Sequence, residues 1–151
     1  MNIPELRRKA ESGTLGAQSA LGICYLEGID IEVDYKEAFF FLSVAADRGA
    51  SRAVTNLARM YAEGLGTPQD IFKAIRLFEG VADFEIRAQL QLGRLYSRGV
   101  GVPIDSVAAR KWYTAVARQD TWVDDPATAA FVGAATLEEI EEARAYLARA
   151  S

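Results

Sequence analysis

Few side chains in this 151-residue sequence could carry out chemistry. The sequence contains one cysteine, Cys24, and no histidine. Histidine is the commonest general base and the commonest zinc ligand, so Cys24 lacks the residue that usually activates a thiol nucleophile. Cys24 also directly precedes a tyrosine on the apolar face of a helical pattern. We therefore interpret Cys24 as a small buried hydrophobic residue and expect no intrachain disulfide.

Two other patterns resemble functional sites only superficially. The triplets GLG at 64–66 and GVG at 99–101 do not continue into a phosphate-binding motif, and no strand precedes them. A group of glutamates opens a helical pattern near the end of the sequence, where carboxylates favour the positive end of the helix dipole. These glutamates are Glu138, Glu139, Glu141 and Glu142, and Thr136 with Glu139 makes a capping box. We predict no enzyme activity, no catalytic residue, no metal site and no cofactor.

The composition is typical of a soluble globular domain. Hydrophobic residues make up 50% of the sequence, charged residues 25%, and the formal net charge is -4. This balance argues against nucleic acid as a partner, and no apolar run is long enough for a membrane span. The N-terminus has no apolar core of a secretory signal. We expect one monomeric domain over residues 1–151, located in the cytoplasm, where a lone cysteine stays reduced.

A phrase that recurs along the sequence defines the architecture that must position any site. Residues 64–70 read GLGTPQD, residues 99–105 read GVGVPID, and residues 28–34 carry the altered copy GIDIEVD. Other columns keep the same spacings of 36 and 35 residues. Self-similarity at such a period is typical of helical repeat proteins. The clearest columns are Tyr25, Tyr61 and Tyr96; Leu21, Leu57 and Leu92; and Ala38, Ala74 and Ala109.

Each copy predicts two helices joined by a capped turn. Apolar residues recur at i, i+4 and i+8 before the phrase, as on one face of a helix. The phrase opens with a glycine where a helix needs a left-handed last residue and closes with an aspartate where the next helix needs an N-cap. A hairpin of this kind buries its apolar stripe only by stacking on its neighbours. The glycines are Gly28, Gly64 and Gly99, and the aspartates are Asp34, Asp70 and Asp105.

The predicted fold is therefore all-α, a right-handed α/α superhelix, or solenoid, of helix-turn-helix repeats. A half repeat opens the sequence, because AESGTLGA at 10–17 matches ADRGASRA at 46–53. A degenerate capping repeat closes it, in which Ala143, Tyr146 and Leu147 match the second-helix residues Ala109, Trp112 and Tyr113. The expected ranges are 3–13 for the first helix, 14–49, 50–84 and 85–119 for three full repeats, and 124–150 for the cap.

At these columns the sequence resembles the Sel-1-like repeats, relatives of the tetratricopeptide repeat with a slightly longer unit. The third repeat, AQLQLGRLYSRGVGVPIDSVAARKWYTAVA at 88–117, matches the family pattern A-x3-LG-x2-Y-x2-G-x-G-x-P-x-D-x3-A-x2-WY-x2-AA in nearly every column. The resemblance implies a non-enzymatic module that holds another protein or a peptide on its concave surface. One secreted branch of the family staples each hairpin with a disulfide and is linked to penicillin binding, and the single cysteine departs from that branch.

The resemblance also implies that the first helix of each hairpin lines the inner curve. Positions of these helices that the core does not use then face the groove, and five of them are arginines. Arginine forks bind carboxylates at two points, so one hypothesis is a groove for an acidic segment or for the C-terminal carboxylate of a partner. The alternative is a solvated face that pairs with local acids. The groove positions are Arg52, Thr55, Arg59, Glu63, Arg87, Gln91, Arg94 and Arg98.

The two tryptophans lead to separate expectations. We expect Trp112 at the centre of the core of the third repeat, so that Trp112→Ala costs about 3–5 kcal/mol. Trp122 lies in the stretch TWVDDPATAAFVG at 121–133, where the repeat pattern breaks. The favoured interpretation is that Trp122 closes the end of the core, since terminal repeats must cover an open face. The alternative is an exposed anchor for a partner.

The leading functional hypothesis is a stand-alone adaptor or an inhibitor of the immunity-protein type. A regulatory subunit in a bacterial signalling or envelope pathway is the alternative within the binding class. Outside that class stand a hydrolase of the cysteine-rich repeat type and a self-assembling structural solenoid.

Overall fold

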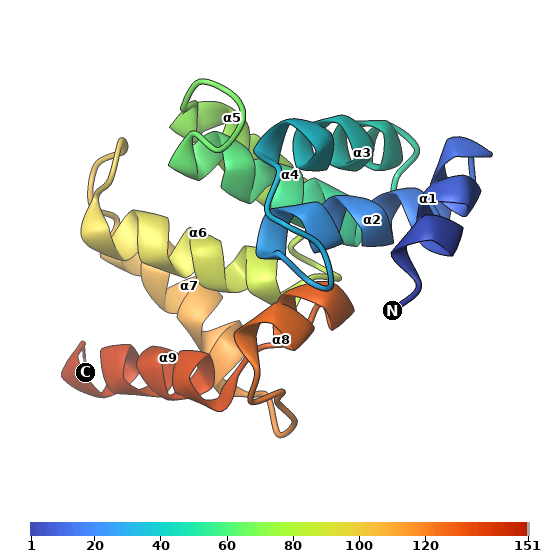
Figure 1. Ribbon diagram of the computed structural model, residues 1–151. Helices are drawn as coiled ribbons and strands as arrows, with labels where there is room; N and C mark the ends of the chain where they lie inside the picture. The colour runs from blue at the N-terminus through green and yellow to red at the C-terminus, as the bar shows by residue number, and fades with distance from the viewer. Residues whose placement is uncertain (151) are drawn as a thin grey trace. The chain divides into compact units, whose positions relative to one another are not determined.

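The computed structural model describes residues 1–150, and all regular secondary structure in that range is α-helical. The predicted all-α class of repeated helices is confirmed. A single helix precedes the helices of the three repeats, as predicted (Figure 1). They are α1 (Ile3–Glu11), α2 (Leu15–Glu27), α3 (Tyr35–Asp47), α4 (Ser51–Glu63), α5 (Ile71–Val81), α6 (Ile86–Arg98), α7 (Ser106–Ala117), α8 (Pro126–Val132) and α9 (Leu137–Arg149).

The protein forms two compact units, which we call unit 1 and unit 2. Unit 1 runs from Met1 to Ala74, and unit 2 begins at Ile75. Unit 1 contains α1 to α4 and the first turn of α5, and unit 2 contains the remainder of α5 with α6 to α9. The boundary thus falls inside a helix of the second repeat and does not coincide with a repeat boundary.

The predicted caps end and begin the helices as expected. Gly28, Gly64 and Gly99 are left-handed, with φ of 72°, 70° and 68°, and they end α2, α4 and α6. The Asp34 and Asp105 carboxylates accept backbone N–H bonds at the start of α3 and α7, and Asp70 accepts one from Lys73. These contacts satisfy amides that the first turn of a helix leaves without an intrahelical acceptor.

Unit 1 is held together by close approach of small and large side chains. A Cβ added to Gly22 on α2 would lie 2.7 Å from Cγ of Leu42 on α3, so a larger residue would separate the two helices. The turn of the second repeat also touches α3. A Cβ on Gly66 would lie 2.5 Å from the Tyr35 carbonyl oxygen, and the φ of Gly66 is +66°, so this turn position requires glycine on both grounds.

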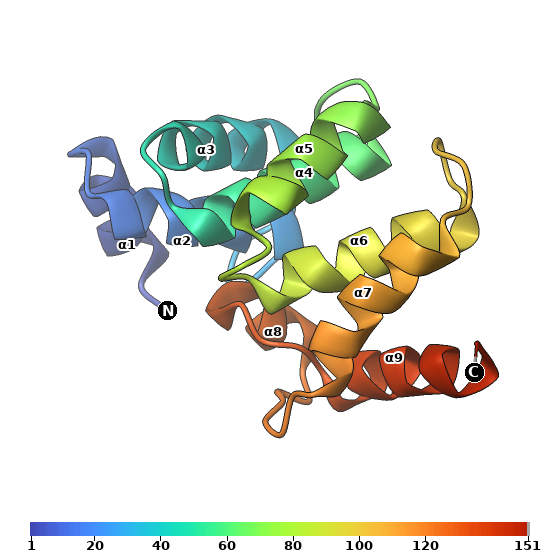
Figure 2. The same ribbon diagram turned by 180° about the vertical axis from the view of Figure 1, so that it is seen from behind.

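Unit 2 encloses a core between α6, α7 and α9. Leu90, Tyr113, Val116 and Ile140 are buried in it, and the Tyr113 and Tyr146 ring centroids lie 4.7 Å apart. Both views show α7 beside α6 and α9 (Figure 1, Figure 2). α9 packs mainly along α7 and also contacts α6, which is the relation of α4 to α3 and α2 in unit 1. α9 therefore takes the place of a first helix, and the matching of Ala143, Tyr146 and Leu147 to a second helix is wrong.

The reason for this difference is the segment that precedes α9. A backbone hydrogen bond of 3.0 Å from Val123 N–H to the Ala135 carbonyl joins the two ends of the segment that contains α8. α8 has only seven residues, between an N-cap at Asp125 and a left-handed Gly133. Because the two ends of this segment are joined, α9 packs directly after α7 in the stack of helices.

The expectation for Trp112 is corrected as well. Trp112 is only half-buried, and the Lys111 ammonium lies 4.2 Å from its ring centroid. The neighbouring Tyr113 fills the core instead, with 2% of its surface exposed. Trp122 is 46% exposed, and both the closing role and the anchor role of this residue stay predictions. Tyr113 occupies the column of Leu42, which is buried in the first repeat together with the preceding Phe41.

Candidate partner-binding surfaces

The arginines predicted to form one groove divide between the two units. Arg52 and Arg59 lie on α4 in unit 1, whereas Arg87, Arg94 and Arg98 lie on α6 in unit 2. Their surroundings within each unit decide which of them a partner could reach.

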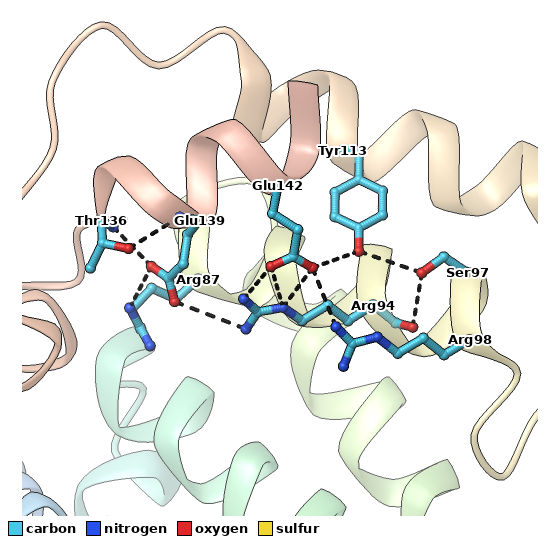
Figure 3. Close-up of polar contacts among 8 residues, drawn as sticks. All are labelled: Arg87, Arg94, Ser97, Arg98, Tyr113, Thr136, Glu139 and Glu142. Carbon is cyan, nitrogen blue, oxygen red and sulfur yellow. Dashed lines mark hydrogen bonds and ion pairs between the residues drawn. The ribbon is translucent and has the colours of Figure 1, made fainter. Parts of the chain in front are cut away.

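On α6, the arginines face two glutamates of α9 (Figure 3). Arg94 binds Glu142 side-on: Nη2 donates to one carboxylate oxygen at 2.5 Å, and Nε lies 3.1 Å from both oxygens. Arg87 donates to Glu139 at 3.1 Å and to the Ala134 carbonyl at 3.3 Å. Two-point arginine–carboxylate contacts are among the strongest polar contacts in proteins, so this cluster fixes α9 against α6.

Glu139 and Glu142 are each oriented by a second group from their own unit. The Glu139 carboxylate accepts the Thr136 N–H at 2.8 Å, which completes the predicted capping box. The Tyr113 hydroxyl donates to Glu142 at 3.1 Å and lies 3.4 Å from Ser97 Oγ. Arg98 reaches Glu142 only at 3.6 Å, and its side chain is 62% exposed.

Ionisation of Glu142 follows from these contacts. Burial opposes the charged form, but the hydrogen bonds and charge of Arg94, with help from Tyr113 and Arg98, outweigh burial and lower the pKa of Glu142. The pKa of Tyr113 is raised, first by burial and then by the charge of Glu142, although its contact with Ser97 acts in the opposite direction. The lowered pKa of Glu142 keeps this carboxylate charged, so its ion pair with Arg94 persists near neutral pH.

Unit 1 contains a simpler version of the same contact. Arg59 on α4 donates one hydrogen bond of 2.5 Å to Glu27 on α2, and both side chains are less than a fifth exposed. The Arg59 Nε atom is buried and has no hydrogen-bond partner among the described residues. Here too an ion pair joins successive first helices.

The structure therefore changes the predicted groove. Thr55 is buried and its hydroxyl donates to the Ser51 carbonyl, so it is not a groove residue. Arg59, Arg87 and Arg94 are engaged with carboxylates of the same protein and do not form an open anion-binding row. A role for the other predicted positions stays a prediction: Arg52, Glu63 and Arg98 are exposed, and Gln91 is half-buried.

A hollow that the sequence did not suggest lies in unit 1 between α1, α2 and α3. Its volume is about 460 Å³, and its apolar wall comes from Ala10, Phe40, Phe41 and Val44. Phe40 is 59% exposed and meets Phe41 edge to face, with ring centroids 5.1 Å apart. Such an aromatic shelf beside a hollow is a surface that can bury a side chain of a partner.

Three charged side chains form the rim of this hollow. Arg7 lies between two carboxylates, 3.8 Å from Glu11 and 3.7 Å from Glu37. Its guanidinium also lies 5.5 Å from the centroid of the Tyr25 ring, a cation–π contact that helps to hold its position. The rim therefore carries two negative charges and one positive charge.

The repeat columns contained a signal for this hollow. Phe40 occupies the column of Arg76 and Lys111, both of which are exposed charged residues. An aromatic residue in a column that otherwise faces water is a departure from the pattern, and it marks the hollow. The predicted groove positions all lie on first helices, whereas Phe40 lies on a second helix.

Within the described part of the sequence, no group of histidine, cysteine, aspartate and glutamate could hold a metal ion. Cys24 is buried, and burial is the main reason that the pKa of its thiol is raised. None of the described helices has the length and hydropathy needed to cross a membrane.

The helix pairs, their caps and their interhelix contacts define a helical repeat protein. The Sel1 repeat pattern matches residues 16–49, 51–79 and 86–120, which together exceed half of the sequence. The chain belongs to the Sel1 repeat family, and the predicted resemblance is confirmed. The matched segments begin and end close to the three helix pairs, and they exclude α1, α8 and α9.

Solved structures of similar proteins agree with this assignment. A Sel1 repeat protein from Oxalobacter formigenes is 34% identical, with a TM-score of 0.62 over 87% of this protein and 97% of that one. A protective antigen present in uropathogenic Escherichia coli strains, displaying an SLR fold, is 30% identical with a TM-score of 0.70 over 99% of this protein. The match spans 33% of the antigen.

Curated relatives are much longer than this protein. Protein sel-1 homolog 2 of Rattus norvegicus is 40% identical over 76 residues, and that of Mus musculus is 38% identical over the same length. The matched part is 50% of this sequence and only 11% of either relative. Sel1 repeats are generally protein-interaction modules, consistent with a binding role for this protein.

Proposed function

We propose that this protein is a non-enzymatic protein-binding module, of the adaptor or inhibitor type, that holds a segment of its partner in the hollow of unit 1. The observation that carries the proposal is Phe40, which is 59% exposed beside a hollow in a column where the other repeats have charged residues. Aromatic residues, phenylalanine included, are enriched at protein interfaces relative to the rest of the surface.

A test substitution and a matched control substitution examine this proposal. Phe40→Lys places a charged residue at position 40, as the other two repeats have in this column, and it removes the aromatic ring beside the hollow. Phe72→Lys is the matched control, because Phe72 is also an exposed phenylalanine of unit 1, at 66%, outside the hollow. In quantitative affinity capture from the native source, Phe72→Lys should retain the partner, and Phe40→Lys should lose at least about tenfold of it, as for a hot-spot residue. Equal capture by both variants would refute a role for the hollow.

A second candidate is the predicted acidic partner of the first helices. Arg98 supports it, since its side chain is 62% exposed and three arginines face two glutamates in the cluster of α6 and α9. Arg98→Glu should then weaken partner capture while Arg110→Glu, on the exposed side of α7, leaves it unchanged.

Other hypotheses have less support. A regulatory subunit of a bacterial signalling or envelope pathway would use the same surfaces and differs only in its partner. A hydrolase of the cysteine-rich repeat type is disfavoured by the buried thiol and by the absence of histidine. A monomer in the cytoplasm remains our expectation.

A further inference from the structure

We propose that the hollow between α1, α2 and α3 takes a partner segment in which a large apolar side chain stands next to a lysine or arginine. This inference depends on the proposed function and specifies the chemistry of its partner. It follows from three properties of the hollow: its size, the apolar wall and the charge of the rim.

The size of the hollow is sufficient for a large apolar side chain. A volume of about 460 Å³ lies in the lower half of the range of about 300–1,000 Å³ for small-ligand sites. The Phe40 and Phe41 rings, set at 77° to one another, offer one face and one edge to an incoming ring. Offset and edge-to-face contacts are the favoured arrangements of aromatic pairs.

The polar side chain in the wall, Gln18, already has hydrogen-bond partners within the protein. Gln18 is 8% exposed, and its amide donates to the Ala10 carbonyl at 3.2 Å. Its oxygen accepts a hydrogen bond of 2.9 Å from Arg48. An apolar group can therefore enter without leaving Gln18 unpaired.

The rim selects a cation next to that apolar side chain. Glu11 and Glu37 share Arg7 at 3.8 and 3.7 Å, distances too long for hydrogen bonds. Both carboxylates are well exposed, so each keeps oxygen lone pairs for a further donor. A lysine or arginine of the partner would bring the rim close to neutrality, whereas an acidic residue would meet two like charges.

Defined peptides test the inference without knowledge of the partner. The protein labelled with nitrogen-15 is titrated with the capped hexapeptides Gly-Ser-Phe-Arg-Ser-Gly and Gly-Ser-Phe-Glu-Ser-Gly, and amide shifts are followed. We expect the arginine peptide to shift the amides of Ala10, Gln18 and Val44 and to bind about five- to tenfold more tightly than the glutamate peptide.

The double variant Glu11→Gln/Glu37→Gln should reduce that preference to less than about twofold. The matched control is Glu32→Gln/Asp47→Asn, which removes two exposed carboxylates of unit 1 outside the hollow and should leave the preference intact. Thermal unfolding of each variant checks that the fold is retained.

Several results would overturn the inference. Equal affinity for the two peptides, shifts confined to residues outside the hollow, or no shift at millimolar peptide would each do so. A dimer in light scattering that Phe40→Lys dissociates would identify a second copy of the protein as the occupant. The proposed function is tested separately by affinity capture with Phe40→Lys. Loss of the natural partner in that experiment could accompany any of these results.

Discussion

The two units connect successive helices in different ways. In unit 1, α4 follows α3 within an intact repeat pattern, and one ion pair, Glu27 with Arg59, accompanies the apolar fit. In unit 2, α9 occupies the equivalent place without the repeat columns, and Glu139 and Glu142 bind three arginines of α6. The comparison teaches that, where a helix lies outside the repeat pattern, charge-assisted hydrogen bonds add to its apolar contacts in fixing its position.

The core of unit 2 should show the largest effect of a single substitution. Tyr113→Ala removes a fully buried ring that contacts α6 and α9, and we expect it to cost about 3–5 kcal/mol of unfolding free energy. Trp112→Ala is the paired control and should cost about 1 kcal/mol, because Trp112 is half-buried. Urea unfolding measures both values, and a larger loss for Trp112→Ala would mean that the helix register is wrong.

The second-largest effect should come from the ion pairs, and it should differ between the two units. Glu142→Met removes the carboxylate that Arg94, Arg98 and Tyr113 contact, and we expect a loss of about 2–3 kcal/mol. This is below the full value for a buried pair, since both side chains are about a quarter exposed. Glu27→Met in unit 1 should cost about 1–2 kcal/mol, because only Arg59 loses a partner. Equal losses would contradict the difference between the units.

Acid should affect unit 2 through Glu142. The folded-state pKa of Glu142 is lowered, so its contribution to stability is complete above the unfolded value of about 4.3 and is lost as pH falls through the folded pKa. The loss should be smaller than for Glu142→Met because the side chain remains in place. Unfolding measured from pH 6 to pH 3 should show a shallower acid dependence in Glu142→Gln than in the unsubstituted protein.

The helix caps should show the smallest effect and no difference between units. Asp34 accepts two backbone N–H bonds at the start of α3, and Asp105 accepts two at the start of α7. Asp34→Ala and Asp105→Ala should each cost about 1 kcal/mol. Equal thermal shifts would show that the turn is the shared element of the two units, and a twofold difference would show that its surroundings contribute.

The capped turns were predictable because their causes are local. A left-handed glycine and an N-cap aspartate are set by neighbouring residues, and three copies of the phrase place Gly28, Gly64 and Gly99 without knowledge of the rest of the sequence. The same columns predicted the helix pairs. They misplaced Trp112, because two adjacent aromatic residues on a helix point in different directions and the pattern alone does not rank them.

The interhelix contacts were not predictable from the columns. Arg94 and Glu142 are 48 residues apart, and no repeat relates α9 to the earlier first helices. The glutamates of α9 had been explained by the helix dipole and the capping box, so their arginine partners were assigned to a ligand. Phe40 could have been recognised as an aromatic residue in a charged column, although the hollow beside it also requires Arg7 and Ala10 from α1.

The buried Cys24 provides a kinetic probe of one unit. It is the only thiol of the sequence, it lies in the core of unit 1, and burial raises its pKa. Alkylation requires both access and the thiolate, so the rate of labelling under native conditions reports transient opening around α2. An opening confined to unit 2 would leave this thiol unlabelled, and pulse alkylation with mass spectrometry would therefore measure whether the two units open together or in sequence.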